Sequence, residues 1–183
     1  IDLTDALLPM ALCADARLAD GGLIGDPTEG ALIVLAAKGG IDLEAARERY
    51  PRVAEVPFDS DYKFMATFHR MVDLDGRDVV RCLVKGAPDV VIARCTQAGG
   101  PLSGSQVPMA QALADVEAAN VRMGEKGLRV LAFAARLVAP DEVDQMAEVP
   151  PGAIDVTKPS PGPPGAAVRY APPVVGKFAE LVD

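Results

Sequence analysis

The decisive part of this sequence is residues 78–88, DVVRCLVKGAP, in which an apolar run meets a glycine and a proline. The run is typical of a buried strand, and Pro88 supplies the fixed φ of a first helical turn. Gly86 removes a side chain that would crowd the turn between them. Lys85 thus lies at a strand-to-helix junction that favours an anion, although a plain solvated lysine is the commoner outcome there.

Two more runs of alternating polarity precede this one, at residues 53–58 and 64–70, and a turn at 73–76 leads into residues 78–85. Alternation of this kind predicts successive antiparallel strands. A further, well-buried strand is expected at residues 128–134. The middle of the fold is therefore predicted to be an antiparallel sheet.

Helical spacing predicts helices before and after these strands. The first should cover residues 3–19, with Pro9 as a kink or as a boundary between two turns. The second should begin at the N-cap Asp26, with Pro27 in its first position, and end at Gly39. Shorter or longer helices are expected at 43–50, 88–95 and 109–124, and a surface loop at 97–108.

Composition bounds the function. The chain has 183 residues, half of them hydrophobic, which suits a single domain with its own core. A formal charge of −8 without a basic cluster argues against a nucleic-acid partner. Three cysteines without a CxxC pair indicate neither disulfides nor zinc and fit a reducing cytosol. No apolar run approaches the roughly 20 residues of a membrane span, so no direct membrane contact is expected.

The two ends of the chain differ from its middle. The start at Ile1 has neither an initiator Met nor a signal-peptide pattern, which suggests a piece of a longer protein. Eight of the 16 prolines lie between residues 150 and 173, so residues 138–173 are expected to form a flexible Pro-rich loop or arm within the domain 1–183. Residues 174–182 could be a strand or a short helix. One functional alternative is a non-catalytic interaction module that uses this arm.

Several catalytic motifs are missing from the sequence. It contains no GxxxxGK[ST] loop, no GxGxxG turn and no GxSxG elbow, which argues against P-loop, Rossmann and serine-hydrolase chemistry. His69 is the single histidine, so we expect it to be structural.

Four short motifs follow one another along the chain, and their order is informative. They are GDPTEGAL at 25–32, PFDSDYKFM at 57–65, VKGAPD at 84–89 and GLRVLA at 127–132. Together they resemble the nucleotide-binding (N) domain of P-type cation-transporting ATPases, and most closely the calcium-pump-like group with its bacterial members. The resemblance covers about residues 7–137. It implies an α/β (α+β) fold, in which helices flank an antiparallel β-sheet.

The resemblance also implies a function. Such a domain binds ATP, as Mg-ATP in the intact pump, and presents it to a phosphorylation domain whose DKTGT motif is absent here. The expected partners are ATP and the phosphorylation and actuator domains of the same parent chain. The parent would be an ATP-driven cation translocase, with calcium as the expected ion, and this chain a cytoplasmic domain of that multi-pass cell-membrane protein. The isolated chain should bind ATP without turnover and should hold no catalytic residue and no metal ligand.

By resemblance, Phe58 would stack on adenine and Glu29 would accept a hydrogen bond from the adenine amino group, with Thr28 as a weaker contact. Two alternatives stay open at this point. Phe58 also fits a plain core position, and Glu29 fits the third helical position of a capping box closed on Asp26.

The remaining nucleotide contacts implied by the resemblance are Lys63, Lys85, Gly86, Ala87, Arg129, Leu131 and Met65. Of the two lysines, one would lie toward the phosphates and the other deep in the adenine pocket, and Arg129 would reach the phosphates. Gly86 and Ala87 leave room for the nucleotide to approach the backbone closely. Arg129 also fits an exposed residue in a surface ion pair, and Met65 fits the core. Ser60 stands where many calcium pumps have an arginine, so one phosphate contact is expected to be missing or to be supplied from elsewhere.

Overall fold

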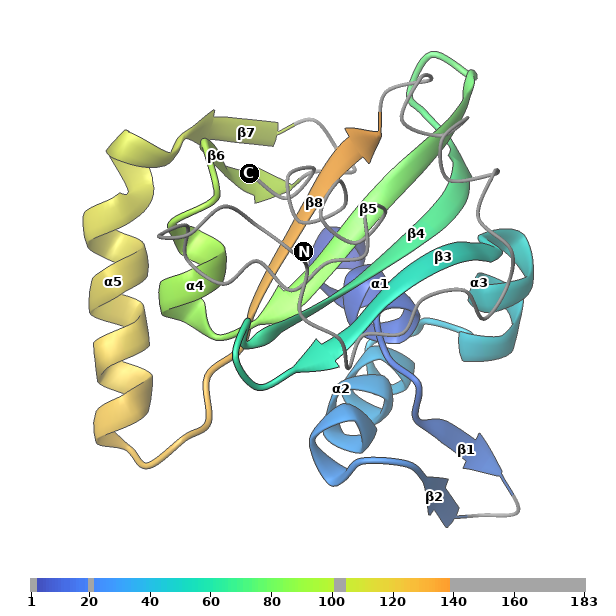
Figure 1. Cartoon of the computed structure of the whole chain (residues 1–183), viewed down its shortest axis with the longest axis horizontal. Helices are drawn as coiled ribbons and strands as arrows, with labels where there is room; N and C mark the ends of the chain where they lie inside the picture. The colour runs from blue at the N-terminus through green and yellow to red at the C-terminus, as the bar shows by residue number, and fades with distance from the viewer. Residues whose placement is uncertain (1–2, 20–21, 101–104, 139–183) are drawn as a thin grey trace, which may run out of the picture.

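The computed structural model describes residues 3–19, 22–100 and 105–138 (Figure 1). The arm expected at 138–173 and the segment 174–182 lie outside these residues, apart from Val138, which ends the last strand. None of the described helices has the length and apolar character that a bilayer span requires.

A four-stranded antiparallel sheet forms the centre, in the order β3-β4-β5-β8 (Figure 1). Its strands are β3 Arg52–Asp59, β4 Phe64–Val72, β5 Asp78–Gly86 and β8 Ala132–Val138. The three successive strands expected from the alternating runs are confirmed. The fourth begins four residues later than expected and is half-buried along most of its length.

The two faces of the sheet build two cores, because successive side chains of a strand point to opposite faces. On one face, Met65, Met71 and Leu83 pack with Leu12 and Cys13 from the N-terminal part of the chain. The other face contributes a second cluster that includes Val91 and the strand residues Phe64, Ala66, Phe68, Cys82 and Val84.

Three helices precede the sheet in the chain: α1 Thr4–Leu12, α2 Pro27–Lys38 and α3 Leu43–Arg49. Helices α1 and α3 contribute Leu12 and Ala46 to the first core, whereas Ala36 of α2 packs with Leu7 and Ala11 of α1 in a smaller cluster. The start of α2 is confirmed, since the Asp26 carboxylate accepts hydrogen bonds from the amides of Thr28 and Glu29 at 2.8 and 3.2 Å. The short α4, Pro88–Ile92, follows β5, and the long α5, Met109–Glu125, stands at the far side of the molecule from α3 (Figure 1).

Two expectations were wrong. The first helix ends at Leu12, and residues that continue its apolar spacing instead form the hairpin β1 Arg17–Ala19 and β2 Gly22–Ile24. The surface loop expected at 97–108 contains a second hairpin, β6 Gln97–Gly100 paired with β7 Ser105–Pro108. In both places the backbone N–H and C=O groups are paired between two short antiparallel strands. The local amino-acid composition does not predict this pairing.

Candidate functional site

The motif residues meet at one end of the central sheet, where β4 begins, β5 ends and β8 begins. In the strand register Lys85 lies between Met65 on β4 and Phe133 on β8. The N-terminus of α2 lies against this end, because the Lys85 Nζ atom is 2.5 Å from Oε1 of Glu29. Both side chains are nearly buried, with 7% and 14% of their surfaces exposed.

Glu29 has three donors on its carboxylate. Besides the Lys85 ammonium on Oε1, the backbone amides of Asp15 and Ala16 donate to Oε2 at 2.8 and 3.0 Å. The capping box considered for Glu29 is therefore only half formed: Asp26 caps the helix, while the Glu29 carboxylate is held by the preceding loop and by β5. The side chain ties three segments of the chain together.

Gly86 and Ala87 lie against the turn that connects β3 to β4. The Ala87 amide donates to the Lys63 carbonyl at 2.9 Å. A Cβ on Gly86 would lie 2.6 Å from that same carbonyl oxygen, so only glycine allows the approach. Lys63 has a positive φ of 60°, a conformation that costs a non-glycine residue energy and that clusters at functional sites. Its ammonium is 3.8 Å from the Asp89 carboxylate and mostly exposed.

Phe58 is not a core residue. It lies near the end of β3, just before Asp59, which pairs with Phe64 and through it with Gly86. Its side chain is 62% exposed, which is unusual for phenylalanine, a residue that is mostly buried. An exposed ring at the same end of the sheet as Lys85 is free to stack on a planar ligand.

The other motif residues lie around the Glu29–Lys85 pair and differ in how far their side chains are buried. Arg129 Nη1 lies 3.5 Å from the Thr28 hydroxyl, which brings the approach to β8 next to the start of α2. Leu131 is half-buried at the entry to β8. Met65 is 1% exposed, packs in the first core and lies beside Lys85, its partner in the strand register. The structure thus brings Thr28, Glu29, Lys85 and Arg129 into direct contact pairs.

Two arginines missed in the sequence support this arrangement. Arg47 on α3 and Arg52 on β3 donate to backbone carbonyls of residues 11–16, the segment that carries the amides bound to Glu29. Their sequence signal is weak, because an arginine in a helix or at a strand start is usually a solvated charge.

His69 has a structural role, as expected. Its Nδ1 atom is 2.9 Å from the Tyr50 carbonyl and its Nε2 atom is 3.0 Å from the Thr67 hydroxyl. Burial lowers its pKa to about 4, because desolvation disfavours the imidazolium. In the described part of the chain, no group of His, Cys, Asp and Glu side chains is arranged to hold a metal ion.

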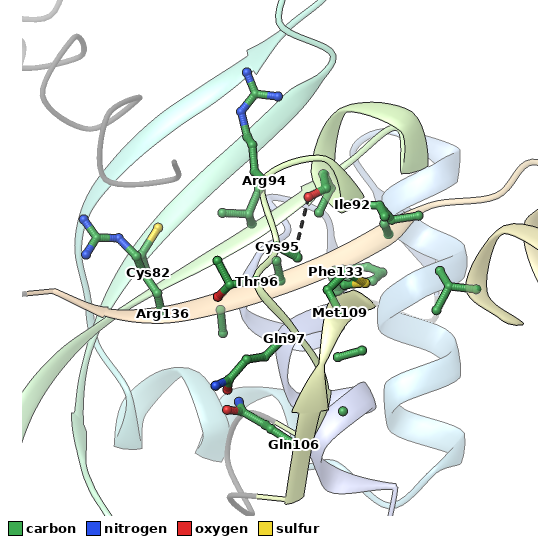
Figure 2. Close-up of a pocket in the computed structure, with 18 of the residues that line it drawn as sticks. Cys82, Ile92, Arg94, Cys95, Thr96, Gln97, Gln106, Met109, Phe133 and Arg136 are labelled. Atoms are coloured by element: carbon green, nitrogen blue, oxygen red, sulfur yellow. Dashed lines mark hydrogen bonds between the residues drawn. The ribbon is translucent and has the colours of Figure 1, made fainter. Parts of the chain in front are cut away.

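A hollow of about 920 Å³ lies on the other face of the sheet, away from the side chain of Lys85. Figure 2 shows Cys82 and Arg136 from the sheet, Thr96, Gln97 and Gln106 from the β6–β7 side, and Met109 from α5 around it. Its walls contain none of Glu29, Phe58 and Lys85. The hollow is therefore separate from the Glu29–Lys85 pair and from Phe58, whereas Leu131 at the entry to β8 lines it.

Comparison with known proteins supplies the family. A model of the P-type ATPase cytoplasmic domain N matches residues 2–156. Calcium-transporting ATPase 1 of Lactococcus lactis is 39% identical over 150 residues, which cover 78% of this chain and 16% of that protein. Cation-transporting ATPase pma1 of Synechocystis is 38% identical over 142 residues, or 75% and 15%. Calcium-transporting ATPase type 2C member 1 of Homo sapiens is 41% identical over 127 residues, or 68% and 13%.

The chain spans between 13% and 16% of the length of these three relatives. The antiparallel sheet with flanking helices agrees with the matched domain. This chain therefore belongs to the cytoplasmic N domains of the P-type ATPases.

Proposed function

We propose that this chain binds ATP at the cluster around Lys85 and presents it to a phosphorylation domain outside this chain. The observation that carries the proposal is the gathering of an exposed ring, Phe58, and the cations Lys63, Lys85 and Arg129 at one end of the sheet. A ring and several cations are what a nucleotide, with a planar base and an anionic tail, requires.

The base would stack on Phe58, a contact worth about 1–3 kcal/mol in proteins that bind nucleotides through aromatic rings. Thr28, Glu29 and Leu131 would border the base, with Met65 beside Lys85. Glu29 already accepts three hydrogen bonds, and a carboxylate offers about four acceptor positions, so one remains for an adenine amino group.

The phosphates would lie toward the exposed Lys63 and toward Arg129, while Lys85, paired with Glu29, would lie deep in the adenine pocket. An ammonium at about 4 Å from a phosphate gains on the order of 1–4 kcal/mol before desolvation. Gly86 and Ala87 leave the backbone open to close approach. Against the cost of association these contacts leave little surplus, so we expect a Kd of about 1 mM. Weak binding suits a domain that must hand its ligand over.

The wider role follows from the family. The parent protein would couple hydrolysis of Mg-ATP to cation transport across a cell membrane, with this domain on the cytoplasmic side. The actuator and phosphorylation domains of that chain would be its partners. Two of the relatives are named as calcium-transporting ATPases, which favours calcium as the ion.

Titration of the chain with ATP, followed by amide chemical shifts, tests the proposal. Shifts should concentrate around Glu29, Phe58 and Lys85. Phe58→Ala should weaken binding at least fivefold, as loss of about 1 kcal/mol of stacking requires. The matched control is Leu74→Ala, which removes an exposed apolar side chain from the turn at the other end of the sheet.

Two results would contradict the proposal. In one, the amides around Lys85 do not shift at saturating ATP. In the other, Leu74→Ala weakens binding as much as Phe58→Ala does, which would place the nucleotide elsewhere.

A further inference from the structure

We propose that Arg47 and Arg52 are positioning residues for Lys85. They hold residues 11–16, which comprise the end of α1 and the loop after it and are here called the clamp loop. The amides of Asp15 and Ala16 in this loop hold Glu29, and Glu29 in turn holds the Lys85 ammonium. The functional meaning of this relay rests on the proposed role of Lys85 as a nucleotide ligand.

The first step of the relay is a set of arginine-to-carbonyl hydrogen bonds. Arg52 Nη2 donates to the carbonyls of Leu12 and Ala14 at 3.1 and 3.0 Å. Arg47 Nη2 donates to the carbonyl of Ala16 at 2.8 Å and lies 3.3 Å from that of Ala14. Two guanidinium groups from different elements therefore converge on the Ala14 carbonyl.

The second step follows from the geometry of the peptide unit. The carbonyl of Ala14 and the amide of Asp15 belong to one planar trans peptide, in which the two groups point in opposite directions. When the arginines fix the carbonyl on one side, they aim the amide at the other side. That amide donates to Glu29 Oε2 at 2.8 Å, and the amide of Ala16 joins it at 3.0 Å.

The third step is the pair of Glu29 and Lys85. With Oε2 held by two amides, the carboxylate has little freedom to rotate, so Oε1 is a fixed acceptor for the ammonium. Charge-assisted bonds of this kind are the stronger ones in proteins. The lysine nitrogen is thereby fixed through Arg47 and Arg52, which are not themselves among the proposed nucleotide contacts.

Arg52 is itself held in place by two carboxylates. Its Nη1 atom lies 2.6 Å from Asp15 Oδ1 and 2.7 Å from Glu55 Oε2. The guanidinium therefore uses one nitrogen for carboxylates and the other for loop carbonyls. A lysine has a single nitrogen and cannot do both in this geometry.

The test measures each step separately. Trace acetylation with acetic anhydride, read per lysine by mass spectrometry, reports whether the Lys85 nitrogen is held or accessible. Amide hydrogen exchange at Asp15 and Ala16 reports the clamp loop. Glu29→Gln should raise the acetylation rate of Lys85 about tenfold, as loss of a charge-assisted bond would, while the two amides stay protected.

Arg52→Met should act on both readouts. We expect about threefold faster acetylation of Lys85 and about tenfold faster exchange at Asp15 and Ala16. Arg47→Met should shift both in the same direction. Should Arg52→Met fail to fold, Arg52→Lys keeps the charge beside the two carboxylates and should still loosen the loop.

The matched control is Arg77→Met. It also removes an arginine that contacts two carboxylates, Asp73 and Asp75, but at the other end of the sheet. Equal acceleration of Lys85 acetylation by this control would overturn the proposal, because it would indicate general loosening. Folded Arg52 and Arg47 variants with unchanged acetylation of Lys85 would also overturn it.

The relay and the proposed function fail in different ways. Acetylation and amide exchange are measured without nucleotide, so the relay stands or falls by them alone. If the relay holds and ATP still causes no shifts in the wild-type chain, then Lys85 is held for another purpose. If both hold, Arg52→Met should also weaken ATP binding about threefold.

Discussion

Gly86→Ala is the most direct test of how the site is assembled. The added Cβ would lie 2.6 Å from both the Lys63 carbonyl oxygen and the Phe64 Cβ, about 0.8 Å closer than ordinary van der Waals contact. Both neighbours are fixed by the backbone, since Phe64 pairs with Gly86 in the sheet. The clash is relieved only if the turn before β4 moves away from β5.

The cost follows from two losses. Forcing an extra carbon into a packed place costs about 1–3 kcal/mol. Moving the turn also breaks the 2.9 Å hydrogen bond from the Ala87 amide to the Lys63 carbonyl, a further loss of about 0.5–1.5 kcal/mol. We therefore expect the free energy of unfolding to fall by about 2–4 kcal/mol.

Urea unfolding measures this change, with an unchanged m-value as the sign that the unfolded state is the same. Gly124→Ala is the control with the opposite sign. Gly124 lies in the last turn of α5, where a Cβ would meet nothing within 4 Å, so alanine should stabilise the helix by up to about 0.5 kcal/mol. A Gly86→Ala variant as stable as the wild type would refute the close-approach reasoning.

Three further predictions concern buried and capping groups. Because the pKa of His69 is about 4 in the fold against 6.5 in the unfolded chain, stability should fall by about 3 kcal/mol as pH drops from 6.5 to 4. His69→Gln should remove this pH dependence, so the urea midpoint of the variant should change less between pH 6.5 and pH 4 than the midpoint of the wild type does. Burial raises the pKa of Cys13 to about 11, so a thiol reagent at pH 8 should label half-buried Cys95 first; mass spectrometry that finds both labelled equally fast would contradict this. Asp26→Ala should speed hydrogen exchange of the first-turn amides of α2, and unchanged exchange would count against the cap.

The sequence predicted best where a local rule decides the structure. The start of α2 needs only Asp26 as a cap and Pro27 in the first turn, and the strands β3 to β5 follow from alternation. The end of α1 does not follow from such a rule. The apolar spacing continues past Leu12, but Arg47 and Arg52 hold the next carbonyls from more than 30 positions away.

The site shows the same division. The motifs identified which residues gather, yet the partners of Glu29 come from a loop 13 and 14 positions earlier and a strand 56 positions later. Whether Phe58 is core or exposed likewise depends on how β3 ends against its neighbours. Local sequence patterns thus identify the residues of the site, whereas the exposure of each side chain and its bonding partner depend on contacts between residues distant in the sequence.

The contact between Thr28 and Arg129 joins positions 101 residues apart. One consequence concerns the order of events during synthesis. The start of α2 and the first three strands leave the ribosome before Arg129, Leu131 and β8 do. A ligand that contacts both the start of α2 and the segment before β8 cannot bind until Arg129 and Leu131 have been synthesised. The nascent domain therefore cannot bind such a ligand until nearly all of the described chain has emerged.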